Sequence, residues 1–156
     1  MYQNQVHTKR TDSSQPDYQA LVAFLDADLK IRDGADHAFF AQYNKSDAIQ
    51  HVIVFYANEI AVGCGALKFF SPGVTEIKRM FVRPESRCQG IASKILNELE
   101  TWAAELHFTE CVLETGKKQP EAIALYLKSG YNRIPNYAQY ENVASSICMK
   151  KVICKK

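Results

Sequence analysis

Residues 76 to 106, EIKRMFVRPESRCQGIASKILNELETWAAEL, decide the fold of this chain. Their first part continues a strand that we expect at 75–82, and a short loop with the sequence RCQGIA follows at 87–92. Beyond the loop, apolar residues recur at the i, i+3, i+4, i+7 spacing of a helix on a sheet: Ile91, Ala92, Ile95, Leu96, Leu99, Trp102, Ala103 and Leu106. A strand, a loop and an amphipathic helix in this order form the context that a phosphate-binding loop requires.

The loop itself has the chemistry of an anion site. The first N–H groups of a helix have no intrahelical acceptor, and the macrodipole places positive charge there, so a pyrophosphate is a natural ligand. Gly90 lets a ligand approach the backbone, Ala92 keeps the next turn clear, and Arg87 offers a bidentate guanidinium. A plain tight turn at Gly90 with a solvated Arg87 is the alternative.

Two motifs carry a resemblance to a known family. The pattern Arg87-x-x-Gly90-x-Ala92 resembles the acetyl-CoA loop of the GCN5-related N-acetyltransferase (GNAT) superfamily. The segment EAIALYLKSGY at 121–131 resembles that superfamily's next motif, a helix bearing a Tyr and followed by Gly and an aromatic residue. The resemblance implies one α/β domain over residues 1–156, with a mixed, mainly antiparallel twisted sheet flanked by helices. It also implies that the strands at 75–82 and 109–114 are parallel and splay apart around the cofactor.

The resemblance further assigns acetyl-CoA, as co-substrate, to particular residues. The main chain of Phe81 and Val82 is expected to bind the pantetheine arm, and the pyrophosphate is expected to bind to Arg87, Cys88, Gln89, Gly90, Ile91 and Ala92. Gln119 stands where the family frequently has an Asn in contact with the cofactor, and its amide has similar chemistry but a longer reach. Cys88 is either a thiolate favoured by the loop or a thiol tolerated where the family often has Gly.

An N-acetyltransferase must present a neutral amine to a thioester and return a proton to the departing thiolate, and binding both substrates together supplies much of the acceleration. Tyr126 matches the superfamily's Tyr near the CoA sulfur, which predicts a general acid; packing of its ring in the core is the alternative. Glu76 is our first candidate for the general base, directly or through water, and Glu114 is the second. A solvated or ion-paired Glu76 is the alternative.

The acyl acceptor is less well defined by the sequence. By analogy its site is walled by segments 36–44 and 135–142, which contain Asp36, Phe39, Phe40, Tyr43, Tyr137, Gln139 and Tyr140. These aromatic residues can bracket a small amine that Asp36 orients, or they can be core residues. The resemblance implies transfer of an acetyl group from acetyl-CoA to a primary amine of a small molecule. A protein lysine or N-terminal acceptor, or a non-catalytic acyl-CoA sensor, is the alternative.

Patterns in the rest of the chain predict the remaining elements: a strand at 3–9, a loop that ends near Pro16, a helix from Tyr18 that stops around Asp33 and Gly34, a short helix or turn at 36–43, a hairpin at 48–56 and 60–70, a helix from about 119 to 129 and a strand at 144–153. Within the strand at 75–82, the odd step from Ile77 to Met80 breaks the period of two. Either a β-bulge restores one apolar face, or both faces of the strand are buried.

The composition of the 156 residues excludes several classes of protein. The net charge of +2 comes from scattered Lys and Arg residues, which argues against a nucleic-acid partner. No apolar run has the length of a membrane span, and the five widely spaced cysteines indicate a reducing cytoplasm. Cys64, Cys111 and Cys148 lie in apolar runs and are expected to be buried. No His or Cys pair has zinc-ligand spacing, so we expect no metal. The sequence leaves open whether the chain forms a homodimer.

Overall fold

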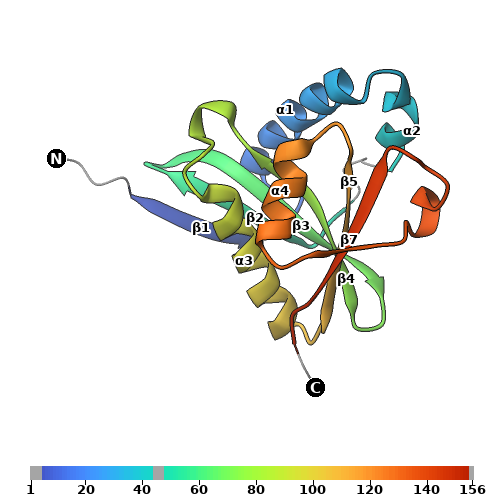
Figure 1. Ribbon diagram of the computed structural model, residues 1–156. Coiled ribbons are helices and arrows are strands. Elements are labelled where there is room, and N and C mark those ends of the chain that lie inside the picture. The colour runs from blue at the N-terminus through green and yellow to red at the C-terminus, as the bar shows by residue number, and fades with distance from the viewer. Residues whose placement is uncertain (1–4, 44–47, 155–156) are drawn as a thin grey trace.

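The computed structural model describes residues 5–43 and 48–154 and contains one seven-stranded sheet with the strand order β1-β2-β3-β4-β5-β7-β6 (Figure 1). Parallel pairing occurs between β4 and β5, and all other neighbours in the sheet are antiparallel. The strands are β1 (Val6–Thr11), β2 (His51–Ala57), β3 (Ile60–Ser71), β4 (Val74–Val82), β5 (Glu110–Gly116), β6 (Asn132–Ile134) and β7 (Ser146–Val152). This sheet and its helices confirm the predicted α/β fold.

The helices divide between the two faces of the sheet (Figure 1). They are α1 (Pro16–Asp33), α2 (His37–Ala41), α3 (Ile91–Glu105) and α4 (Pro120–Lys128), with 3₁₀ turns η1 (Gly34–Asp36), η2 (Pro84–Ser86) and η3 (Ala138–Tyr140). The predicted apolar stripe of α3 packs in a core that also contains Tyr126 of α4, except for Leu106, which is exposed just beyond the end of the helix. Tyr18 and Leu21 of α1 belong to a second core on the opposite side of the sheet. Among the described residues, no helix is both long and apolar enough to cross a membrane.

A β-bulge interrupts β4 at Arg79 and Met80. Cys64 pairs with Phe81 and Ala66 pairs with Lys78, so Arg79 and Met80 of β4 stand opposite the single residue Gly65 of β3. Arg79 has a left-handed φ of 59°, which is unusual for a residue with a Cβ. Its guanidinium is buried and donates to Asp26 Oδ1 over 2.6 Å, which anchors the bulge to α1.

The bulge turns apolar side chains of β4 to one face, which was one of the two alternatives predicted. Ile77, Met80 and Val82 all pack in the core beneath α3, although the step from Ile77 to Met80 is odd. Phe81 points to the opposite core, beneath α1. The bulge is therefore confirmed as the source of the common apolar face.

Strands β4 and β5 separate soon after they pair. Their parallel register covers Val74 to Glu76 of β4 and Glu110 to Val112 of β5. From Ile77 to Val82 the edge of β4 that faces β5 therefore has no strand partner in the described part of the chain. Its main-chain groups are available to a ligand, apart from the Val82 carbonyl, which accepts a hydrogen bond from Arg87 Nε. This confirms the predicted splay of the two strands.

The differences from the predicted elements are local. The first strand lies at Val6–Thr11, shifted toward the C-terminus, and part of the predicted range, residues 3–4, falls outside the described residues. The segment at 36–43 forms η1 and α2. The sequence analysis missed β6, because a three-residue strand that pairs with β7 at its edge is too short to show a period.

Gly65, opposite the bulge, provides the space into which α3 packs. A Cβ at this position would lie 2.6 Å from Met80 Sδ, 2.8 Å from Leu99 Cδ1 and 3.0 Å from Ile95 Cγ2. We expect Gly65→Ala to lower the free energy of unfolding by about 1–3 kcal/mol, measured by chemical denaturation. Gly116→Ala is the control, since its nearest contact would be an ordinary 3.5 Å. Equal stability of the two variants would contradict this packing argument.

Candidate active site

A groove of about 480 Å³ lies where β4, the loop after it and the helices α3 and α4 meet. It has walls from Met80 at the bulge, from Ser86 and Ser93, and from α4. Most of the residues that the resemblance assigned to acetyl-CoA line this groove: Phe81, Val82, Arg87, Cys88, Gly90, Ile91, Ala92 and Gln119. Gln89 is exposed and is not part of the lining. The roles of all these residues in cofactor binding stay predictions.

The loop at the head of this groove keeps the start of α3 open. Gly90 is the N-cap of α3 with a left-handed φ of 77°, and no side chain caps the helix. A Cβ at Gly90 would meet no atom within 4 Å, so the backbone conformation is the structural reason for glycine there. Arg87 Nε donates to Val82 O over 2.9 Å, and its terminal nitrogens make no hydrogen bond to a described residue. The uncapped helix start and this guanidinium together suit an anion.

Cys88 precedes these groups in a strained conformation. It is exposed and has a φ of 62°, in the left-handed region that favours glycine. We expect Cys88→Gly to raise the free energy of unfolding by about 0.5–1 kcal/mol, because the relief of strain exceeds the extra entropy of glycine in the unfolded chain. Cys88→Ala keeps the strain and serves as the control in the same denaturation experiment. A gain with Ala equal to that with Gly would show that the backbone conformation is not the cause.

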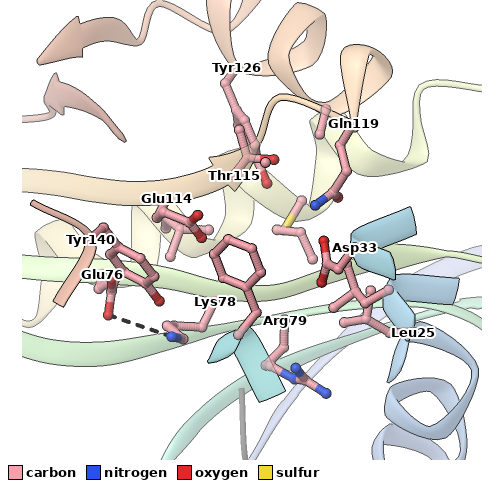
Figure 2. A pocket seen from close by; sticks show the side chains of 16 residues that line it. Leu25, Asp33, Glu76, Lys78, Arg79, Glu114, Thr115, Gln119, Tyr126 and Tyr140 are labelled. Atoms are coloured by element: carbon pink, nitrogen blue, oxygen red, sulfur yellow. Dashed lines mark ion pairs between the residues drawn. The ribbon is translucent and has the colours of Figure 1, made fainter. Parts of the chain in front are cut away.

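A second, smaller cavity of about 100 Å³ adjoins the groove (Figure 2). The two share the same five lining residues at their junction: Leu25, Met80, Gln119, Ala122 and Tyr126. The far part of the small cavity is lined by ionisable side chains: Asp33, Glu76, Lys78, Arg79 and Glu114. A ligand in the groove and a ligand in the small cavity would therefore meet beside Tyr126.

Tyr126 packs in the core and also lines the junction of the two cavities, and its role as general acid stays a prediction. Its ring packs edge-on against Tyr131, with the ring centroids 5.9 Å apart, and only 6% of the residue is exposed. Its hydroxyl makes no hydrogen bond to any described residue. Burial, assisted by the nearby charge of Glu114, raises the pKa of Tyr126 well above its ordinary value. The phenol is therefore a protonated donor at the junction of the two cavities.

Glu76 is buried and held in place by two neighbours. Its Oε2 accepts a hydrogen bond from the Tyr137 hydroxyl over 2.7 Å, and its Oε1 lies 4.0 Å from Lys78 Nζ (Figure 2). Burial and the adjacent Glu76 carboxylate raise the pKa of Tyr137, which keeps that phenol a donor. Lys78 Nζ also donates to the carbonyl of Tyr43 over 3.2 Å, and burial lowers the pKa of Lys78. The carboxylate of Glu76 therefore already has a hydrogen-bond donor and a nearby cation.

Glu114 on β5 is in a different electrostatic position. Burial raises its pKa to about 7, although a hydrogen bond from Ser146 and the charge of Lys78 act in the opposite direction. The Ser146 hydroxyl donates to Oε2 over 2.7 Å, and Glu114 forms no ion pair with a described residue. A carboxyl group with a pKa near 7 can exchange a proton efficiently at neutral pH.

The predicted acceptor walls contribute only in part. Phe40 and Tyr140 line the small cavity, whereas the other predicted wall residues are not in its lining: Asp36, Phe39, Tyr43, Tyr137 and Gln139. Asn44 lies outside the described residues. The carboxylate that this region supplies to the cavity is Asp33, which the sequence analysis passed over as a helix stop. Among residues 5–43 and 48–154, no cluster of His, Cys, Asp and Glu is arranged as a metal site.

The groove, the bulge and the splayed strands can now be compared with known proteins. The model of the acetyltransferase (GNAT) family matches residues 12–131, which include α1, the bulge, the anion loop and α4. The chain belongs to this acetyltransferase (GNAT) family. Membership confirms the resemblance that the loop and the Tyr126 helix suggested.

Individual members of the GNAT family differ in how much of the chain they match. The IAA acetyltransferase of Azospirillum brasilense is 36% identical over 91 residues, which are 58% of this chain and 60% of that relative. A Klebsiella pneumoniae structure, provisionally assigned as an acyl-CoA N-acyltransferase, has a TM-score of 0.79 and 27% identity, covering 96% of this chain and 98% of that one. An Elizabethkingia anophelis family member with acetyl-CoA bound has the same fold, with a TM-score of 0.69, 18% identity and coverages of 94% and 97%.

Proposed function

We propose that the chain is an acetyl-CoA-dependent N-acetyltransferase that acts on a primary amine of a small molecule. The observation that carries the proposal is the position of Tyr126, which lines both the groove and the small cavity. It places a proton donor where two substrates would meet, near a carboxyl group whose pKa is raised to about 7. Membership of the GNAT family supports the same activity.

The groove is chemically suited to acetyl-CoA. The unpaired edge of β4 offers main-chain groups to the amides of the pantetheine arm. The uncapped start of α3 and the free nitrogens of Arg87 offer N–H donors and positive charge to the pyrophosphate. When bound there, acetyl-CoA supplies the acetyl group as a thioester.

The side chains at the junction account for the proton transfers. An amine enters as an ammonium ion, and Glu114 takes its first proton, directly or through a water molecule, so that the neutral amine can attack the acetyl carbon. The C–N bond forms, the C–S bond breaks, and the Tyr126 hydroxyl donates a proton to the departing thiolate. The Tyr126 phenolate then takes the second proton from the nitrogen, which leaves a neutral amide and restores the phenol. We assign the base role to Glu114 rather than Glu76, because Tyr137 and Lys78 already hold Glu76 in place.

The test is a panel of primary amines, amino acids and lysine-containing peptides, assayed for release of the free thiol of CoA from acetyl-CoA. We expect turnover with small amines, since a cavity of about 100 Å³ matches a ligand of a few heavy atoms. Turnover with peptides alone would indicate a protein acceptor. Binding of acetyl-CoA without turnover of any amine would support the sensor alternative and overturn the proposal.

A further inference from the structure

The charges that line the small cavity are unevenly balanced. Its two cations are already engaged: Arg79 with Asp26, and Lys78 with the carbonyl of Tyr43 and with Glu76. Two carboxyl groups of the lining, Asp33 and Glu114, form no ion pair with a described residue. The lining therefore has two carboxyl groups that no cation contacts directly, which favours a cationic ligand.

Of these two carboxyl groups, Asp33 is the stronger indication of a cationic ligand. It is the last residue of α1 and is only 6% exposed, yet its carboxylate makes no hydrogen bond to a described residue. Lys118 Nζ donates to the main-chain carbonyl of Asp33, over 3.4 Å, and not to the carboxylate. Burial is the largest effect and raises the pKa of Asp33. The charges of Asp36 and Asp28 act in the same direction, and the charges of His37 and Lys118 act against it.

A largely buried carboxylate that gains no hydrogen bond within the protein does not stabilise the fold, so stability does not explain Asp33. Figure 2 shows Asp33 and Glu114 on opposite sides of the cavity, with both carboxyl groups directed toward its interior. Asp33 comes from the end of α1 and Glu114 from β5, so each group is placed by a separate, well-packed element. Two acidic groups that face each other across a cavity match a ligand with a positive charge at each end.

We infer that Asp33 forms a second acceptor subsite and that the acceptor is a small diamine. One amino group loses its proton to Glu114 and is acetylated beside Tyr126, while Asp33 binds the other as an ammonium ion. This inference rests on the proposed function. The size of the cavity agrees with it: a protein cavity of about 150 Å³ holds benzene, so about 100 Å³ takes a chain of a few heavy atoms.

The charges argue against an α- or ω-amino acid as the acceptor. Its carboxylate would face Asp33 if its amine lay at Glu114, and the like charges would repel. The cations that could bind it instead, Lys78 and Arg79, already have partners. A simple monoamine leaves Asp33 unpaired and gains only the contacts at the reacting end.

The experiment compares α,ω-diamines with monoamines of the same length: 1,3-diaminopropane, putrescine and cadaverine against propylamine, butylamine and pentylamine, with γ-aminobutyrate as the amino acid. We expect the best diamine to exceed its matched monoamine about 10-fold or more in kcat/KM, because a charge-assisted hydrogen bond to a buried carboxylate is added. γ-Aminobutyrate should be the poorest acceptor of the three types.

Asp33→Asn should lower kcat/KM for diamines about 10- to 100-fold, mainly through KM, and change monoamines by less than about 2-fold. Asp36→Asn removes a carboxylate three residues away that does not line the cavity and acts on Asp33 only through its charge. It should change diamines and their matched monoamines by the same small factor, less than about 2-fold. Calorimetry of the same amines with the protein saturated with CoA measures the subsite without turnover, and should give tighter binding of diamines to the wild type only.

Equal kcat/KM for matched diamines and monoamines, or an equal loss for both in Asp33→Asn, would overturn the diamine subsite while leaving the proposed function intact. Failure of every amine to release thiol would overturn the proposed function. In that case preferential binding of diamines to the CoA-loaded protein would still support the subsite, and its absence would overturn the subsite as well. If Asp33→Asn does not fold, the wild-type comparison of diamines with monoamines decides.

Discussion

Replacing Glu114 with Gln is expected to lower kcat/KM at about pH 8 by about 100- to 10,000-fold, the usual contribution of a positioned general base. The change keeps the size of the side chain and its contact with the Ser146 hydroxyl, but it removes the proton acceptor. Initial rates of thiol release from acetyl-CoA, at saturating and limiting amine, measure the loss. A variant with wild-type rates would show that the ammonium proton leaves by another route.

The pH profile gives a sharper version of this test. Because the pKa of Glu114 is raised to about 7, kcat/KM of the wild type should rise as the pH increases through about 7, where the carboxylate forms. Glu114→Gln should lack this rise. Glu76→Gln is the matched control: it alters the hydrogen bond from Tyr137 and should retain the rise near pH 7. Loss of the rise in Glu76→Gln, and not in Glu114→Gln, would reverse our assignment.

The same substitution should change stability with the opposite sign to activity. The pKa of Glu114 is higher in the folded state, at about 7, than its ordinary value of 4.5, so its contribution to stability is complete below 4.5 and is lost as the pH rises through 7. Gln resembles the protonated acid at every pH. Glu114→Gln should therefore match the wild type at about pH 4 and be more stable at about pH 8, by up to about 3 kcal/mol. Denaturant unfolding at the two pH values measures this difference.

Local patterns predicted the cofactor side of the molecule. The loop at 87–92, the helix behind it and the odd step from Ile77 to Met80 are all encoded within a few residues of one another. The loop predicts an open helix start, which the structure has. The odd step left two alternatives open, a β-bulge or a strand buried on both faces, and the structure has the bulge, with Arg79 in the left-handed region. These features depend on neighbouring residues and not on distant parts of the chain, which explains why a sequence can indicate them.

The small cavity depends on contacts between distant segments, and the sequence is much less informative there. Whether Glu76 or Glu114 is free to take a proton depends on Tyr137 and Ser146, which lie 61 and 32 residues from them in the chain. Asp33 ends an amphipathic helix, where an acidic residue before Gly34 indicates only a stop. No pattern in the sequence shows that the end of α1 lies across a cavity from β5.

Replacing Tyr126 with Phe is expected to lower kcat about 100-fold or more, with little change in KM for acetyl-CoA. The hydroxyl makes no hydrogen bond to a described residue, so its removal breaks no structural contact. The ring of Phe can keep the edge-on packing against Tyr131. Stability should therefore remain unchanged, because the hydroxyl makes no hydrogen bond that supports the fold. Thiol release and thermal unfolding of the same preparation measure the two effects.

Tyr131→Phe separates proton donation from packing, because Tyr131 contacts Tyr126 but uses its hydroxyl differently. Its O–H donates to Glu100 Oε2 over 2.9 Å, away from the groove and the small cavity. This variant should lose about 1–3 kcal/mol of stability and keep its kcat, which is the reverse of the expectation for Tyr126→Phe. Equal kcat in Tyr126→Phe and the wild type would assign the proton of the departing thiol to water. A loss of kcat in both variants would assign the effect to packing of the two rings.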